Sequence, residues 1–115
     1  MNLIRLKRHQ HPKPPHHELR QKRVLDVDSR SIGQVTNLYV DEDMELQFLD
    51  VAESGFMGLR TKHYLGPVEA VADEGAGAIT LEVDQQAVER APTYADPHAG
   101  PDEELQRSTR EHYGY

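Results

Sequence analysis

Short β-favouring segments alternate with turn signals through the middle of this 115-residue chain. Residues 24–28, 32–40, 44–51 and 79–83 are rich in β-branched, aromatic and other apolar residues, and clusters of Ser, Asp, Glu and Gly separate them. Strands this short, with turns about every eight to twelve residues, are typical of a small all-β barrel or sandwich and argue against βαβ units. The pattern predicts a mainly β fold.

The third of these segments changes its apolar phase half-way. Met44, Leu46 and Phe48 alternate with polar residues, and Leu49 and Val51 then continue on the opposite phase. Because successive side chains of a strand point to opposite faces, this change predicts a bulge or a strand that bends around a barrel corner.

Two segments after the last strand favour helix. Residues 85–91 follow Asp84, a good N-cap residue, and end before a proline, which predicts a short helix. Residues 101–113 begin with proline and acidic residues, which suit the start of a helix. The apolar stripe of this second helix is poor, with Leu105 and Tyr113 as its main anchors, so we expect weak docking.

The net charge of −7 hides a division along the chain. Residues 1–23 hold seven Lys or Arg against one Glu, a charge of +6, whereas the remainder carries −13. Charge and composition together divide the chain into a basic, His- and Pro-rich N-terminal arm (1–19), a β domain (20–94), and a linker with a C-terminal helix (95–115). We expect one domain with two flanking segments.

Several classes of site are excluded by composition and motif. The chain has no Cys, and therefore no disulfide, no cysteine-ligated zinc, no iron–sulfur cluster and no thiol nucleophile. It shows no phosphate loop or dinucleotide fingerprint, and we expect no cofactor. No apolar run approaches the ~18 residues of a membrane span, and residues 1–23 lack the apolar stretch of a signal peptide. We therefore expect a cytoplasmic protein with no transmembrane segment.

The order of the motifs resembles the PRC-barrel family over residues 20–94. The matching pieces are the strand 24–28, the Ile32-Gly33-Gln34-Val35 strand, the Gly55-Phe56-Met57-Gly58 tip, the Pro67-Val68-Glu69-Ala70-Val71 strand and the short helix that ends in Ala91-Pro92. The family includes the cytoplasmic domain of the photosynthetic reaction-centre H subunit and the C-terminal domain of a ribosome maturation factor. The resemblance implies a small, bent antiparallel β-barrel, with a short helix after the last strand and a C-terminal helix, that acts as an adaptor and pairs with itself. The ends of the chain look like those of stand-alone bacterial members, some of them linked to stress responses.

The histidines of the arm suggest a metal site. His9, His11, His16 and His17 form a His-x-His and a His-His pair around a Pro-rich hinge, and imidazoles in such an arrangement would bind Zn, Ni or Cu. The competing interpretation, which we favour, is a solvated flexible tail, because no positioned carboxylate accompanies the histidines.

The charge of the arm has two further interpretations. It would contact the phosphates of RNA or of an anionic membrane, but it contains no aromatic residue for base stacking and precedes an acidic body. It would equally lie on the acidic body of its own or a neighbouring subunit. An RNA- or ribosome-associated module is therefore an alternative function rather than the favoured one.

Four aromatic or apolar residues are candidates for interaction with a partner. Phe56 and Met57 occupy the glycine-bounded tip, which matches the Gly-x-x-Gly of a KH loop but is expected to join two strands. Tyr113 and Tyr115 lie at the C-terminal end. We expect a homodimer in which such residues contribute to the contact, and the identity of any other protein partner is open.

A catalytic triad of His63, Asp50 and Ser54 is conceivable, but neither a nucleophile elbow nor an oxyanion-binding helix start accompanies these residues. The sequence thus favours a non-enzymatic, self-associating interaction module. A metal-binding protein that uses the histidine arm is the second alternative function.

Overall fold

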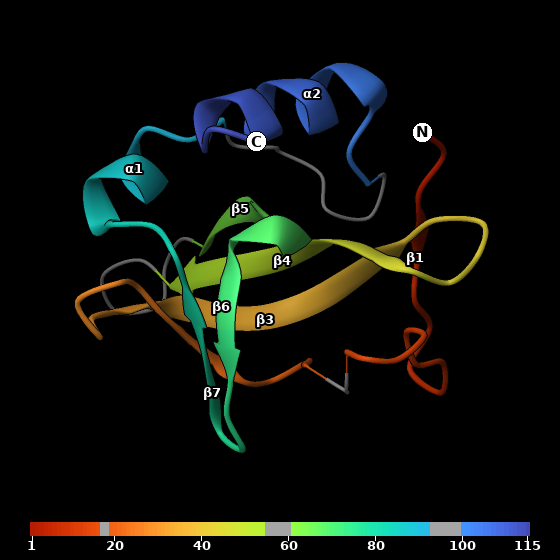
Figure 1. The fold of residues 1–115 in the computed structure, drawn as a ribbon, viewed down its shortest axis with the longest axis horizontal. Helices are drawn as coiled ribbons and strands as arrows, with labels where there is room; N and C mark the ends of the chain where they lie inside the picture. The colour runs from red at the N-terminus through yellow and green to blue at the C-terminus, as the bar shows by residue number, and fades with distance from the viewer. Residues whose placement is uncertain (17–18, 55–60, 93–99) are drawn as a thin grey trace.

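The computed structural model describes residues 1–16, 19–54, 61–92 and 100–115. Figure 1 shows a strongly curled sheet with both α-helices above it. The elements are β1 (Ile4–Arg5), β2 (Arg23–Leu25), β3 (Ser31–Val40), β4 (Leu46–Ser54), β5 (Thr61–Pro67), the 3₁₀ helix η2 (Val68–Ala70), β6 (Val71–Glu74), β7 (Ala78–Leu81), α1 (Gln85–Glu89) and α2 (Glu103–His112). The predicted mainly β barrel with a short helix after its last strand and a C-terminal helix is confirmed.

The strands form one sheet in the order β5-β4-β3-β2-β7-β6, and β1 pairs with the end of β3. All pairs are antiparallel except β2 with β7, which is parallel. This one pair departs from the antiparallel arrangement that the resemblance implies. After β3 to β6, the chain forms β7, which lies beside β2 and runs in the same direction. Because β2 and β7 are far apart in sequence, local patterns do not reveal their pairing.

Two register shifts bend the central pair of strands. Between β3 and β4, Val35 and Asn37 pair with consecutive residues of β4, and Tyr39 and Val40 pair with Phe48 and Leu46. The extra residue is Thr36 in the first shift and Gln47 in the second. The bulge predicted from the change of apolar phase is confirmed, and it increases the local curl of the sheet.

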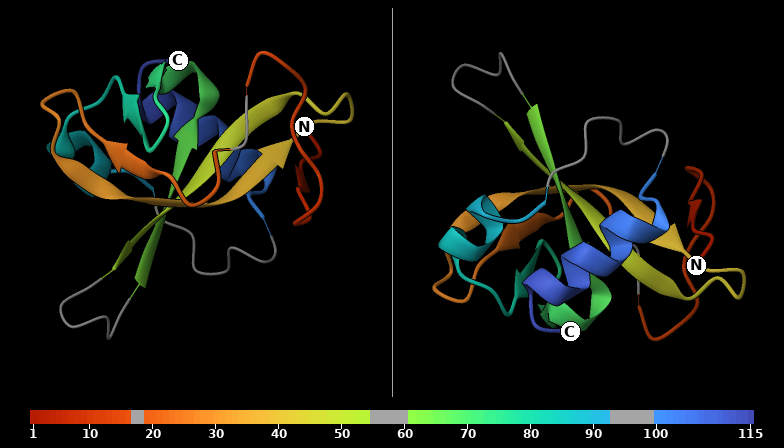
Figure 2. Two further views of the ribbon diagram at one scale, coloured as in Figure 1. Left: turned by 90° about the horizontal axis from the view of Figure 1, so that it is seen from below. Right: turned by 90° about the horizontal axis from the view of Figure 1, so that it is seen from above.

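The curled sheet buries side chains on both faces. The main core fills the concave face, and its largest members come from the central strands, with Leu6 and Leu19 added by the N-terminal arm. A smaller core on the opposite face consists of Tyr39, Phe48 and Leu65, packed against Leu3 and Leu105. The right-hand view of Figure 2 shows α2 lying across the strands on that side.

The helix α2 docks through polar as well as apolar side chains. Gln106 and Thr109 are buried, and the Gln106 Nε2 donates to the carbonyl oxygens of Met1 (2.8 Å) and Pro101 (3.1 Å). Asp102 caps the helix by accepting from the Leu105 amide at 2.8 Å. Gln106 thus adds hydrogen bonds that an apolar stripe does not register, whereas the buried Thr109 hydroxyl has no hydrogen-bond partner among the described residues. The expectation of weak docking from the poor apolar stripe stays a prediction.

A guanidinium group ties the same helix to the sheet. Arg110 lies with its Cζ 4.5 Å from the centre of the Phe48 ring and forms an ion pair with Glu69 at 2.8 Å. Its Nη2 also donates to the Gln47 side chain at 2.9 Å. The aliphatic and planar parts of the Arg110 side chain thereby cover the smaller core.

The helix α1 forms where the sequence predicts it. The Asp84 carboxylate accepts from the Ala87 amide at 2.7 Å, as a helix N-cap does. Among the described residues, no helix is long and apolar enough to cross a membrane.

Gly33 provides a test of how closely the strands pack. A Cβ atom at this position of β3 would overlap the carbonyl oxygen of Ala52 in β4, and backbone there has little freedom to move. We expect Gly33→Ala to lower the free energy of unfolding by roughly 1–3 kcal/mol or more, measured by urea unfolding followed with circular dichroism. Gly77→Ala is the matched control, since the methyl group it adds would have no atom within 4 Å, and its effect should stay within about 0.5 kcal/mol. Equal stability of the two variants would contradict this close packing.

Candidate interaction surface

The N-terminal arm lies on the body of its own chain. Leu6 and Leu19 are buried in the main core. The Leu6 amide donates to the Leu38 carbonyl at 2.9 Å, and the Lys13 amide donates to the Met44 carbonyl at 2.8 Å. The favoured prediction of a solvated tail is wrong for the described part of the arm, because these apolar anchors and backbone bonds hold it against the sheet.

Three of the four predicted metal ligands lie in the part of the arm that the structure describes. His16 pairs through Nδ1 with Glu74 at 2.9 Å, whereas His9 and His11 are exposed on other parts of the arm. His17 lies outside the described residues. Within the described ranges, no group of three or more His, Asp or Glu side chains is placed to hold a metal ion. Metal binding by the four histidines stays a prediction.

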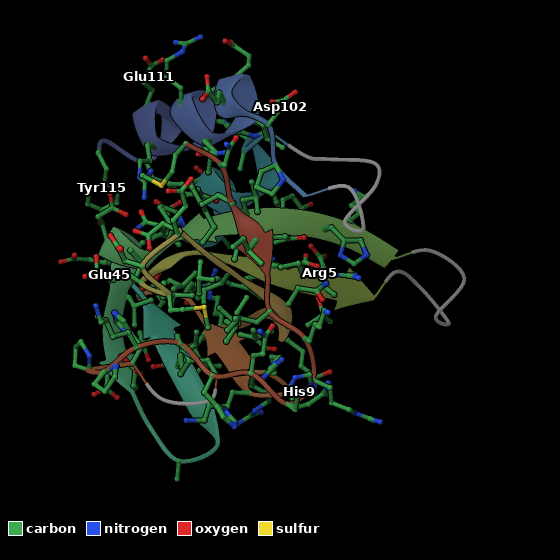
Figure 3. All side chains as sticks on the ribbon, turned by 90° about the vertical axis from the view of Figure 1, so that its right-hand side faces the viewer. Arg5, His9, Glu45, Asp102, Glu111 and Tyr115 are labelled. Atoms are coloured by element: carbon green, nitrogen blue, oxygen red, sulfur yellow. The ribbon has the colours of Figure 1, made fainter. Side chains whose placement is uncertain are left out.

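An open groove of about 930 Å³ runs beside the arm. The described residues that line it include four cations and no carboxylate; they are Arg5, Leu6, Lys7, Arg8, Arg20, Gln21, Thr36 and Asn37. Figure 3 shows Arg5 and His9 on the side of the molecule where the arm crosses in front of the sheet. Four of the seven Lys and Arg residues among the first 23 thus line one hollow surface.

Arg20 shapes the rim of this groove. Its guanidinium donates to the backbone carbonyls of Lys7 (2.8 Å) and Gln10 (2.5 Å). The Gln10 amide also donates to the Lys7 carbonyl at 2.9 Å, and its side-chain oxygen accepts from the Lys7 amide at 2.9 Å. This closed turn presents Lys7 and Arg8 to solvent, and neither side chain forms an ion pair with any residue that the structure describes.

A buried carboxylate supports the groove from behind. Asp50 of β4 is fully buried and accepts at Oδ2 from the Thr36 hydroxyl (2.9 Å) and the Asn37 side-chain amide (2.7 Å). Its Oδ1 lies 2.9 Å from Nδ1 of His63 on β5. Both oxygens therefore hold three strands together, and two of the donors also line the groove.

The conceivable triad is only partly placed. His63 and Asp50 are in contact, but the side chain of Ser54 lies outside the described residues. The Asp50 carboxylate is already shared with the two donors from β3, which is the pattern of a structural network.

The four residues predicted to contact a partner differ in whether the structure describes them and in how far they are buried. Phe56 and Met57 lie outside the described residues. Tyr113 packs against the main core, and burial raises the pKa of its hydroxyl to about 12. Tyr115 is exposed, and slight burial together with Glu82 and Glu69 raises its pKa. The role of these residues in an interface stays a prediction.

The sequence profile of the PRC-barrel domain matches residues 15–88, more than half of the chain. The chain belongs to the PRC-barrel family. No curated protein sequence matches it. The matched range ends within α1, so residues 1–14 of the arm and all of α2 lie outside it.

The basic groove straddles the boundary of the PRC-barrel match. Arg20, Thr36 and Asn37 lie within the matched range, whereas Lys7 and Arg8 precede it. The positive charge of the arm was visible in the sequence, but the hollow it lines was not, because that depends on where the arm meets β3. Membership of the family does not by itself assign a use to this groove.

Asp50 offers a direct test of the network behind the groove. Replacing its carboxylate by an amide in Asp50→Asn removes the charge and sets an NH₂ group against donors from the neighbouring strands. We expect a loss of about 1–3 kcal/mol in the free energy of unfolding, measured by urea titration. Asp28→Asn, at an exposed position, should change it by less than about 0.5 kcal/mol. An Asp50→Asn protein as stable as the parent would refute the structural role of the carboxylate.

Proposed function

We propose that this PRC-barrel protein is a non-enzymatic interaction module that associates with itself through the face carrying β1. A PRC barrel is in general an interaction module. This agrees with the use of the buried polar side chains around Asp50, which join strands of the sheet. The observation that carries the self-association is Ile4, which is 47% exposed although it lies in the paired strand β1. Met1, at the start of the same arm, is 50% exposed.

The position of β1 suits contact with another molecule. It pairs only with the end of β3, where Ile4 lies opposite Val40, so the strand lies at the rim of the sheet. Strands at a sheet rim, and apolar residues exposed on them, are common places of association. A contact there would cover Ile4 without displacing either core.

A non-enzymatic role is supported by how the polar side chains are used. The Asp50 and His63 pair is tied to β3 donors, and the neighbouring Thr36 hydroxyl donates its proton to the Asp50 carboxylate as one of these structural contacts. The groove beside it presents cations rather than an acid and a base. Such a surface binds and positions a partner but does not by itself supply proton transfer.

In this role the protein would act in the cytoplasm as a homodimeric adaptor. The ends of the chain resemble those of stand-alone bacterial members, which would connect the protein with stress responses. Its barrel resembles that of the reaction-centre H subunit, which would connect it with the assembly of a larger complex. RNA binding is less well supported, because none of the described residues that line the groove is aromatic.

Sedimentation velocity over a concentration series tests self-association. We expect a species of twice the monomer mass at high micromolar concentration, because a buried Ile4 pair would stabilise it. Ile4→Asp should abolish that species, and Val27→Asp, at a similarly exposed residue at the far turn of the sheet, should leave it intact. A strict monomer throughout the series would contradict the self-association.

A further inference from the structure

The turn between β3 and β4 is built to present carboxylates. Asp41 accepts at Oδ1 from the amides of Asp43 (2.8 Å) and Glu45 (3.0 Å), and at Oδ2 from the Gln47 side chain (3.0 Å). Met44 adopts a positive φ of 64° and packs against the main core. One acidic residue thus fixes the turn, and one apolar residue anchors it.

Three other acidic side chains of this turn remain unused. Glu42, Asp43 and Glu45 are exposed, and none of them pairs with a described cation. We call these three residues the acidic turn. Carboxylates held close together on a fixed turn repel one another, so a partner with clustered cations would relieve that repulsion.

The acidic turn and the basic groove flank the same strand. Figure 3 shows Arg5, which belongs to β1, and Glu45 on opposite sides of the view. The groove reaches Asn37 in β3, and the acidic turn begins just after Val40 at the end of that strand. Because Ile4 pairs with Val40 and Arg5 with Tyr39, the exposed Ile4 lies along β3 between the groove and the acidic turn.

We propose that the basic groove binds the acidic turn of a second copy of this chain. A two-fold axis near Ile4 would place each groove against the other copy's turn, so that the contact forms twice. Lys7 and Arg8 would then meet Glu42 and Asp43 of the second copy, while the two Ile4 side chains meet at the centre. This pairing rests on the proposed self-association and specifies its geometry.

Charge complementarity favours a second copy over a nucleic acid. None of the described residues that line the groove is aromatic, and the chain beyond residue 23 carries −13, which would repel the many phosphates of a long polyanion. The acidic turn brings only a short cluster of carboxylates. Each copy offers one groove and one acidic turn, with Ile4 between them.

The charged contacts should determine which surfaces pair, and the apolar centre should supply most of the affinity. Exposed ion pairs contribute little each, but like charges brought together across an interface are strongly unfavourable. Reversing either set of charges should therefore abolish pairing, whereas reversing one set in each of two copies should restore it between them.

The experiment is a charge-reversal exchange followed by sedimentation velocity. The groove variant carries Lys7→Glu and Arg8→Glu, and the turn variant carries Glu42→Lys and Asp43→Lys. We expect each variant alone to dimerise at least roughly tenfold more weakly than the parent, and an equimolar mixture to form a heterodimer at parent-like concentrations. Circular dichroism verifies that both variants are folded.

Matched controls separate local contacts from net charge. Arg30→Glu with Arg90→Glu changes the net charge as the groove variant does, and Asp28→Lys with Glu89→Lys matches the turn variant; all four residues are exposed and away from β1. These controls should dimerise like the parent.

The outcomes also distinguish this pairing from self-association in general. A parent dimer that survives both charge reversals, or a mixture that stays monomeric, would overturn the groove-and-turn pairing and leave self-association standing. A monomeric parent would overturn both. Binding of an RNA oligonucleotide in the groove, lost in the groove variant while the dimer is unchanged, would assign the groove to RNA instead.

Discussion

The backbone pairing of β3 is the constraint on which the rest of the structure depends. This ten-residue strand pairs with β4 along most of its length, with β2 at its start and with β1 at its end. Two bulges allow one strand to face partners on different parts of a curled surface. Because β1 is paired at the end of β3, the N-terminal arm becomes part of the folded unit, and its two leucines complete the main core.

The division of charge along the chain becomes a division in space. Leu6 and Leu19 hold the basic N-terminal segment against the sheet, which places four of the seven cations of residues 1–23 around one groove. The acidic turn protrudes from the next connection along the same strand. A domain with a small core gains stability when another surface packs against it. Here the basic groove and the acidic turn, which have complementary charge, both lie on the face that carries β1.

Local patterns in the sequence predicted the parts of the fold that local physics decides. The phase change in 44–51 indicated the bulge, and turn and cap residues indicated the ends of strands and helices. The course of the arm was missed because Leu6 and Leu19 are isolated apolar residues in a basic stretch, without a period that signals burial. The docking of α2 through Gln106 and the network around Asp50 were missed for a related reason: polar residues reveal their burial only when their partners, far away in sequence, are known.

The most direct test of the packed arm is native-state hydrogen exchange of its backbone amides, followed by NMR. The Leu6 amide is bonded to Leu38, the Lys13 amide to Met44 and the Gln21 amide to Val35. If the arm belongs to the folded unit, these amides will exchange at least roughly a hundredfold more slowly than unprotected amides. Unprotected exchange of all three, while the amides of β3 stay protected, would contradict the packed arm and with it the groove that the arm forms.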